Sequence, residues 1–299
     1  MRLFDRRQMA FTVESMTLRL LVFSGRKIES WYSVPLSSNL VREGLISSPE
    51  GVGSVMAEAI RENGIPNRGV VCAVSSTGSA TQTITLPGVT KKNMKEMVGR
   101  EIRRTMPSSV DADFVYWQEL SPELSGEDAQ KQQVYALAVP KNSITSLMEA
   151  CRAAGVTVRG MELKPFALVR AVNCKSGVIV HGEVDNIEVV IVDKFFPGLF
   201  RSIPIKDANP TPDVASENLL RELPFTIDYY NRTYRDAQLD PEAVVYFSGE
   251  LALDPKLAIE ITEVTGREVV GVEPIEEYPP NFPMAQFLTN VGLMLREKW

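Results

Sequence analysis

Hydrophobic and polar residues alternate in short blocks near the start of the chain, and this pattern predicts three extended segments. One run begins at Phe11, and the apolar runs Leu18–Phe23 and Ile28–Val34 lie on either side of a turn at Ser24-Gly25. β-Branched and aromatic side chains are frequent in these runs, which favours strands over helices. The chain is therefore expected to begin with three strands.

A change of period follows these strands. Apolar residues recur three and four positions apart, which predicts a helix with one buried face: Val52, Val55, Met56, Ala59 and Ile60. Gly64 and Pro66 are expected to end this helix. The continuous apolar run Val70–Val74 is typical of a strand buried in a parallel sheet.

The second half of the chain repeats this order. Apolar runs at Val178–Val180 and Val189–Val192, with an extended segment at Phe200–Ile205, predict three strands. A long helix is expected from about Asp213 to Tyr234, and Pro224 is expected to kink or divide it.

A further strand and helix complete the second half. Val244–Phe247 is predicted to be a buried strand, and Asp254-Pro255 is expected to open a helix that Gly266 ends. Each half thus contains strand, strand, strand, helix, strand and further helix. Two copies of this unit predict a duplicated α/β fold with a cleft between the halves. The same order is also compatible with several doubly wound folds.

The region between the halves has a pattern of its own. Lys91–Met106 is predicted to be a helix with a methionine-rich apolar stripe, stopped by Pro107. Strands are expected at Phe114–Leu120 and Val134–Val139, and a helix at Ser143–Ala154. These elements are sufficient for a small α+β subdomain.

Composition narrows the classes of function. The 299 residues carry 32 basic and 38 acidic side chains, and the net charge of −6 argues against binding to nucleic acid or to an anionic membrane. Three cysteines without CxxC spacing indicate thiols of a reducing compartment, and the single histidine, His181, disfavours a histidine-rich metal site. No signal-peptide pattern or long apolar run is apparent, and the amphipathic end at Ala285–Trp299 is expected to be a core helix. The sequence therefore predicts a cytoplasmic protein.

Several segments, taken in order, resemble a known family. Residues 94–120 have its helix, proline and strand, and residues 134–172 have its strand, helix, Ala-Gly turn and next helix. The strand FRSIPI at 200–205, the strand and helix at 244–266 and the closing NVGLMLR at 290–296 continue the match. The chain thus resembles the PilM type IV pilus assembly proteins, which belong with FtsA to the actin-like superfamily.

The resemblance implies an α/β fold of the actin-like type, the ribonuclease H-like duplicated fold with two lobes. It implies a first lobe over residues 1–174, which contains an inserted 1C-type α+β subdomain at about 86–155, and a second lobe over residues 175–299. Relatives insert a 2B subdomain before the long helix, but here only residues 206–212 connect the strand to that helix. The 2B subdomain is therefore expected to be reduced or absent.

Actin-like ATPases hold nucleotide phosphates between two hairpins that begin with Asp, an apolar residue and Gly, because glycine lets backbone N–H groups approach the phosphates. This chain has Thr12 and Glu14 at the Asp and Gly positions of the first hairpin. It has His181 and Glu183 at those of the second, and Glu250 replaces the second glycine of the adenosine motif. The resemblance thus implies a degenerate nucleotide cleft formed by Thr12, Glu14, Ser15, Thr17, His181, Glu183, Asp185, Ser248, Gly249 and Glu250.

Three glutamates in place of glycines would bring bulk and negative charge to a polyphosphate site. Two unit charges about 4 Å apart repel by about 1 kcal/mol in water and about 4 kcal/mol at a protein surface. ATP and magnesium, the cofactors of the family, are therefore not expected to bind here, and the chain is predicted to be a pseudo-ATPase. The alternative is an alignment slip of one residue that leaves a working loop elsewhere.

No catalytic residue and no metal ligand is assigned from the sequence. His181 has no Ser/Asp or Cys partner motif nearby and is expected to be structural. The carboxylates Glu183, Asp185 and Glu188 are expected to lie on a solvated hairpin.

The resemblance also implies a partner. In the PilM family, the cytoplasmic protein is held at the inner membrane by the N-terminal tail of a bitopic PilN-like protein, so membrane contact is expected only through this partner, and contact with nucleic acid is not expected. The helix Lys91–Met106 and the strand Val134–Val139 are the region expected to receive the tail. Other pilus assembly proteins and further copies of the chain are additional candidate partners.

The expected function is a non-catalytic scaffold of a type IV pilus or type II secretion-like assembly. An actin-like ATPase and an FtsA-like filament-forming protein are the alternatives.

Overall fold

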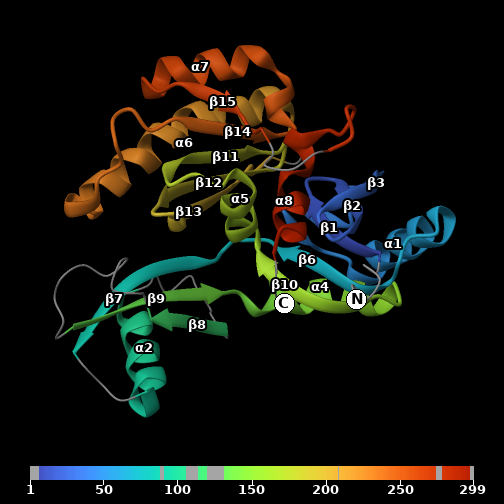
Figure 1. Ribbon diagram of the computed structural model, residues 1–299, viewed down its shortest axis with the longest axis horizontal. Helices are drawn as coiled ribbons and strands as arrows, with labels where there is room; N and C mark the ends of the chain where they lie inside the picture. Colours follow the sequence, from blue (N-terminus) through green and yellow to red (C-terminus); the bar gives the residue numbers. More distant parts are fainter. Residues whose placement is uncertain are drawn as a thin grey trace. The chain divides into compact units, whose positions relative to one another are not determined.

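The computed structural model of the protein describes residues 7–87, 91–105, 114–119, 131–207, 209–273 and 278–296 (Figure 1). The chain forms two compact units. The main unit comprises Met1–Thr77 and Thr145–Trp299, and the small unit comprises Gly78–Ile144.

The first sheet of the main unit has five strands in the order β10-β6-β1-β2-β3. Its strands are β1 (Gln8–Glu14), β2 (Thr17–Ser24), β3 (Lys27–Pro35), β6 (Arg68–Val74) and β10 (Thr157–Leu163). β1, β2 and β3 pair antiparallel through tight turns, whereas β6 pairs parallel with β1 and β10. The strands predicted in the first half of the chain are confirmed, and β10 is additional to them.

Helix α1 (Pro49–Asn63) follows the two short strands β4 (Val41–Arg42) and β5 (Leu45–Ile46). The helix begins with proline in its first turn, where the missing N–H costs no intrahelical hydrogen bond. It ends at Gly64, whose φ of 58° is left-handed, so the predicted end is confirmed.

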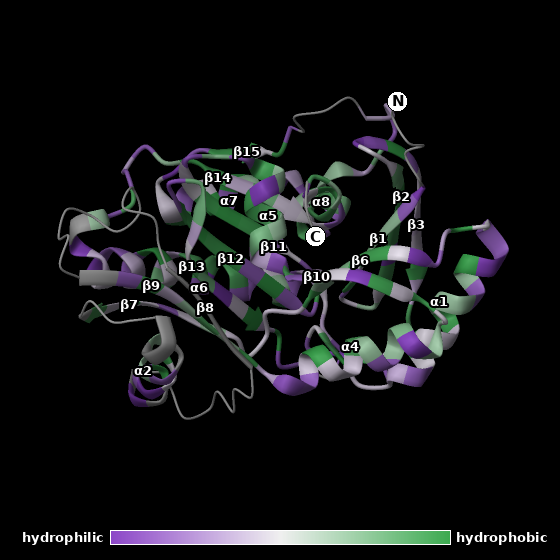
Figure 2. Ribbon diagram, turned by 60° about the horizontal axis from the view of Figure 1, so that its bottom comes forward, coloured by the Kyte–Doolittle hydropathy of each residue, from purple (hydrophilic) through white to green (hydrophobic). Residues whose placement is uncertain are grey.

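The second sheet also has five strands, in the order β13-β12-β11-β14-β15. They are β11 (Ser176–Gly182), β12 (Asn186–Asp193), β13 (Phe196–Pro204), β14 (Val245–Gly249) and β15 (Val269–Gly271). The central strands β11 and β12 are almost entirely buried, and Figure 2 shows them largely in the colour of hydrophobic residues. The strands predicted in the second half are confirmed.

Helices α6 (Pro212–Thr233) and α7 (Pro255–Thr265) pack against the second sheet around one apolar core, with the short helices η1 (Arg235–Ala237) and η2 (Leu251–Leu253) near them. Helix α6 continues through Pro224 as a single element, so of the two alternatives expected at this proline, a kink or a division, the division does not occur. Thr211 caps α6 by accepting the N–H of Val214 at 3.3 Å. The residues between β13 and α6 number only seven, 205–211, as expected for a connection without an inserted subdomain.

Helices α5 (Lys164–Val172) and α8 (Met284–Met294) contact strands of both sheets (Figure 1). A Cβ added to Gly292 of α8 would lie 1.9 Å from the carbonyl oxygen of Ala167 in α5, so the two helices touch through their backbones. Helix α8 packs on β1, β2 and β6, although it lies in the predicted second lobe. Helix α8 also contacts β14, so it joins the two sheets.

The small unit is an antiparallel sheet, in the order β7-β9-β8, with helix α2 packed on it. Its elements are β7 (Ala80–Pro87), α2 (Lys91–Thr105), β8 (Phe114–Glu119) and β9 (Lys131–Val139). Strand β7 is absent from the sequence prediction, and helix α4 (Lys141–Ala153) belongs mainly to the main unit. The inserted unit accordingly spans 78–144 instead of about 86–155. The expected stop at Pro107 lies outside the described residues.

Candidate functional site

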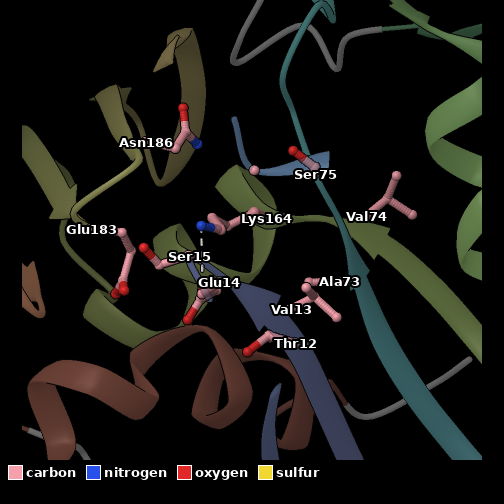
Figure 3. Close-up of a pocket in the computed structure, with 11 residues that line it drawn as sticks. Thr12, Val13, Glu14, Ser15, Ala73, Val74, Ser75, Lys164, Glu183 and Asn186 are labelled. Atoms are coloured by element: carbon pink, nitrogen blue, oxygen red, sulfur yellow. Dashed lines mark ion pairs between the residues drawn. The ribbon is translucent and has the colours of Figure 1, made fainter. Parts of the chain in front are cut away.

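The two hairpins singled out by the sequence approach each other inside the main unit. One is the β1–β2 turn, which follows Glu14 and has Ser15 at a φ of 53°, and the other is the β11–β12 turn that carries Glu183 and Asp185. Figure 3 shows Glu14, Ser15 and Glu183 around one small space, with Lys164 pointing towards Glu14. The side chain that joins the two turns is absent from the set of residues selected by the sequence.

Arg19 is this joining residue. It lies on β2 opposite Thr12 in the hairpin register, and it is only 2% exposed. Its guanidinium donates to Glu14 Oε2 at 2.5 Å and to both carboxylate oxygens of Glu183, at 2.8 and 2.9 Å. Burial lowers the pKa of Arg19, but the two carboxylates outweigh it and the pKa is raised overall.

Glu14 has further partners from three other elements. Lys164 Nζ of α5 lies 3.0 Å from Oε1, Thr289 of α8 donates to the same oxygen at 2.9 Å, and His181 Nε2 lies 3.2 Å from it. Burial raises the pKa of Glu14, but Lys164, His181 and Arg19 together hold it well below its usual value. Glu14 is therefore an ionised carboxylate in a fully enclosed position.

Glu183 and His181 complete the group that we call the buried ion cluster, namely Glu14, Arg19, Lys164, His181 and Glu183. Besides Arg19, Glu183 Oε1 accepts the backbone N–H of Glu250 at 3.3 Å and lies 3.4 Å from His181 Nε2. Burial alone would raise the pKa of Glu183, but Arg19 and His181 have the larger combined effect and lower this pKa overall. Glu183 is therefore also ionised.

The surroundings of His181 favour its protonated form. Ser248 Oγ lies 3.0 Å from His181 Nδ1 and donates to the carbonyl oxygen of Val180 at 3.2 Å. The other ring nitrogen faces two carboxylate oxygens, which accept hydrogen bonds only. Burial lowers the pKa of His181, but the nearby Glu14 and Glu183 raise it overall.

Two more carboxyl groups lie beside the cluster. Burial raises the pKa of Glu188 to about 7, against the opposing effect of Lys164, and Ser76 donates to its Oε2. Burial also raises the pKa of Asp185, which accepts the N–H of Gly44 at 3.2 Å. These groups are buried, so the prediction of a solvated hairpin is wrong. Charged residues in a hairpin sequence look the same whether they face solvent or form ion pairs inside the protein. The sequence pattern alone therefore cannot show that these carboxylates are buried.

Three basic side chains surround the two carboxylates of the cluster. Arg19 and Lys164 face Glu14 and Glu183, and His181 lies against both carboxylates. The repulsion expected from the sequence is therefore largely neutralised inside the protein, which corrects that expectation. Space is the stronger obstacle: the cavity beside these side chains is about 10 Å³, enough for roughly one water molecule. Pockets for small-molecule ligands usually measure about 300 Å³ or more.

A cation is a second conceivable ligand. Glu14, His181 and Glu183 offer ligand atoms that all lie within 4.8 Å of one another. The same oxygens already accept from Arg19, Lys164 and Thr289, so an ion would have to displace two cationic side chains. The arrangement is thus better suited to internal ion pairing than to metal binding.

The structure brings most of the predicted site residues together. Thr12 Oγ1 lies 3.2 Å from Asn290 Oδ1 of α8, and Asn290 donates to the backbone of both β1 and β2. Gly249 has a φ of 89°, and a Cβ there would lie 2.3 Å from the carbonyl oxygen of Gly182, so glycine is required. Thr17 pairs with Glu14 in the hairpin register, but within the described part of the chain its side chain forms no hydrogen bond to the cluster.

Sequence reasoning missed Arg19, Lys164, Thr289 and Asn290. A signal existed for Arg19, since it is a charged residue inside the apolar run Leu18–Phe23. None existed for Lys164 and Thr289, because their partner, Glu14, is far from both of them in the sequence.

Comparison with known proteins agrees with this architecture. The profile of a family described as "Type IV pilus assembly protein PilM" matches residues 15–194. A solved structure titled "PilM-PilN type IV pilus biogenesis complex" superposes with a TM-score of 0.77 at 21% identity, covering 97% of this chain and 98% of that chain.

Two more distant structures share the fold. The cytoplasmic domain of EpsL, an inner membrane component of the type II secretion system of Vibrio cholerae, has a TM-score of 0.54 at 12% identity, with coverage of 98% and 97%. A Bacteroides thetaiotaomicron protein with an actin-like ATPase fold has a TM-score of 0.53 at 10% identity, with the same coverage. The fold of this chain is therefore actin-like, as predicted. None of the described helices combines the length and apolar character that a membrane span requires.

Proposed function

The chain belongs to the PilM family of type IV pilus assembly proteins, and we propose that it serves this assembly as a non-catalytic scaffold that binds the N-terminal tail of a PilN-like membrane protein. On this proposal, it acts at the cytoplasmic face of the inner membrane and reaches the membrane through its partner.

The non-catalytic part of the proposal rests chiefly on one observation: the contact of Arg19 with Glu14 and Glu183. This contact fills the space between the two hairpins with side chains whose hydrogen bonds are already made. A nucleotide would have to break these bonds and also find room in a cavity of about 10 Å³. A phosphate that paired with Arg19 would leave Glu183 without its main cation, and a buried charge that loses its partner typically costs about 3–5 kcal/mol.

The partner part of the proposal is supported by the likeness to the structure titled as a PilM-PilN complex, which extends over nearly the whole of both chains. In this chain, α2 and β9 of the small unit form the region proposed to receive the tail. They share an apolar core that includes Met94, Val98 and Val134. A small sheet with one helix on its face is a rigid support for an extended peptide.

The test is a calorimetric titration of the full chain with a synthetic peptide of the N-terminal tail of the PilN-like protein from the same organism. We expect saturable binding at micromolar concentrations, which corresponds to about −8 kcal/mol, with or without magnesium ATP. A scrambled peptide of the same composition is the control. Absence of binding at high micromolar peptide, or equal binding of the scrambled peptide, would refute the role.

A further inference from the structure

The buried ion cluster joins parts of the main unit that are distant in the sequence. Glu14 and Arg19 come from β1 and β2 of the first sheet, and Glu183 comes from the β11–β12 turn of the second sheet, 164 positions after Arg19. Lys164 of α5 and Thr289 of α8 contact the carboxylate of Glu14. The two sheets are therefore linked by direct ionic contacts as well as by the helices between them.

The donors of the cluster form a set that suits an anion. Arg19 presents two nitrogens to one carboxylate, and the N–H of Glu250 approaches that carboxylate from another direction. Lys164 Nζ and the hydroxyl of Thr289 both point at Glu14 Oε1. A guanidinium fork, an ammonium group, a hydroxyl and a backbone N–H are the groups with which proteins hold carboxylates and phosphates.

We propose that Glu14 and Glu183 are tethered anions, which occupy this anion site from within the chain and clamp the two sheets together without a ligand. Because both carboxylates are attached to the hairpins that they join, their effective concentration at the site is high. A free anion at millimolar concentration therefore does not displace them. The cleft is held closed by the chain's own residues.

The same contacts extend to the connection with the small unit. Ser76 donates to Glu188, and Thr77 Oγ1 lies 3.0 Å from Ser202 Oγ on β13, immediately before the small unit begins at Gly78. The end of the first sheet's strand β6 is thereby fixed to the second sheet. One consequence rests on the proposed function, in which the small unit binds the tail of the PilN-like protein. The chain would then bind that tail without any anion in the cleft.

The decisive experiment is chemical rescue of Glu183→Ala in the full chain. Removing the side chain leaves Arg19 unpaired on that side and opens a space that formate can fill. We expect the melting temperature of Glu183→Ala to fall by several degrees and to recover by about half as sodium formate is raised, with a shift that grows with the logarithm of the formate concentration. Sodium chloride at matched ionic strength should give a much smaller shift.

Three comparisons make the experiment specific. Wild type should not respond to formate beyond the chloride effect, and neither should Glu183→Gln, which keeps the space filled. Glu29→Ala is the control, because Glu29 pairs with Arg7 at 2.8 Å outside the cluster but both side chains are partly exposed, at 31% and 50%, so water already solvates the arginine. If Glu183→Ala folds only when formate is present during purification, the proposal is supported in the strongest form.

Equal formate responses of Glu183→Ala and Glu29→Ala, or no response of Glu183→Ala, would overturn the proposal. Titration of the same proteins with the tail peptide separates it from the proposed function. Rescue by formate without peptide binding to wild type would refute the partner role alone. Peptide binding without rescue would refute the tethered anions alone.

Discussion

Arg19→Met is the perturbation that tests the buried ion cluster most severely. Methionine keeps much of the length of arginine and removes the charge and the three donated hydrogen bonds. Glu14 keeps Lys164 and Thr289 as partners, so most of the loss falls on Glu183. Among the described residues, the Glu183 carboxylate then retains only the N–H of Glu250 and the neighbouring His181.

The expected loss of stability can be worked out from the protonation of Glu183, because a buried carboxylate without a cationic partner becomes neutral by taking up a proton. Glu183 can take up a proton, and at pH 7 this costs about 3 kcal/mol relative to an unfolded chain in which its pKa is 4.5. We therefore expect Arg19→Met to lower the free energy of unfolding by about 3 kcal/mol at pH 7, within the range for breaking a buried pair. The deficit should shrink by about 1.4 kcal/mol for each pH unit towards pH 5.5.

The assay is urea unfolding followed by circular dichroism at several pH values, with Arg232→Met as the control. Arg232 pairs with Asp228 at 3.4 Å but is 82% exposed, so its loss should change the free energy of unfolding by less than about 0.5 kcal/mol. A deficit below about 1 kcal/mol for Arg19→Met at pH 7, or a deficit that does not change with pH, would refute the reasoning.

Two further predictions concern other parts of the main unit. Glu188→Gln removes a carboxyl group whose pKa is about 7 in the folded chain and 4.5 as its ordinary value. The folded wild type holds this proton in that range and the unfolded chain releases it, so wild type should lose stability relative to the variant as the pH rises from 4.5 to 7. Urea unfolding at stepped pH measures this difference, and parallel profiles for the two proteins would contradict it. Gly292→Ala should destabilise the protein by about 2 kcal/mol or more, because its Cβ would meet the carbonyl oxygen of Ala167. Gly271→Ala, where nothing lies within 4 Å, is the control, and equal thermal melts of the two variants would contradict the close helix contact.

The sequence predicts the repeated secondary structure well because that information is local. Most strands of both sheets and helix α6 follow from runs of apolar residues, and the end of α1 follows from Gly64. Strands β10 and β15 are not predicted. Strand β7, ATQTITLP, is not predicted from the sequence, because its threonines and glutamine obscure the alternation of apolar and polar residues that marks a strand. The return of α8 to the first sheet depends on long-range packing, exemplified by Gly292 against Ala167.

The candidate site is predicted in position but not in chemistry. The resemblance places Glu14, His181 and Glu183 at one cleft, and the structure brings them together. The neutralising partner, Arg19, is opposite Thr12 in the strand register and meets Glu183 only when the two sheets associate. Whether a glutamate repels a ligand or is satisfied internally depends on such a distant partner, and pattern alone does not specify it.

The central claim is that the chain's own carboxylates have replaced nucleotide in the cleft. Calorimetric titration of the full chain with magnesium ATP tests it most directly. We expect no saturable heat up to about 1 mM ATP, which corresponds to a binding free energy weaker than about −4 kcal/mol. Saturable binding with one ATP per chain at a dissociation constant of about 100 μM or below would contradict the account.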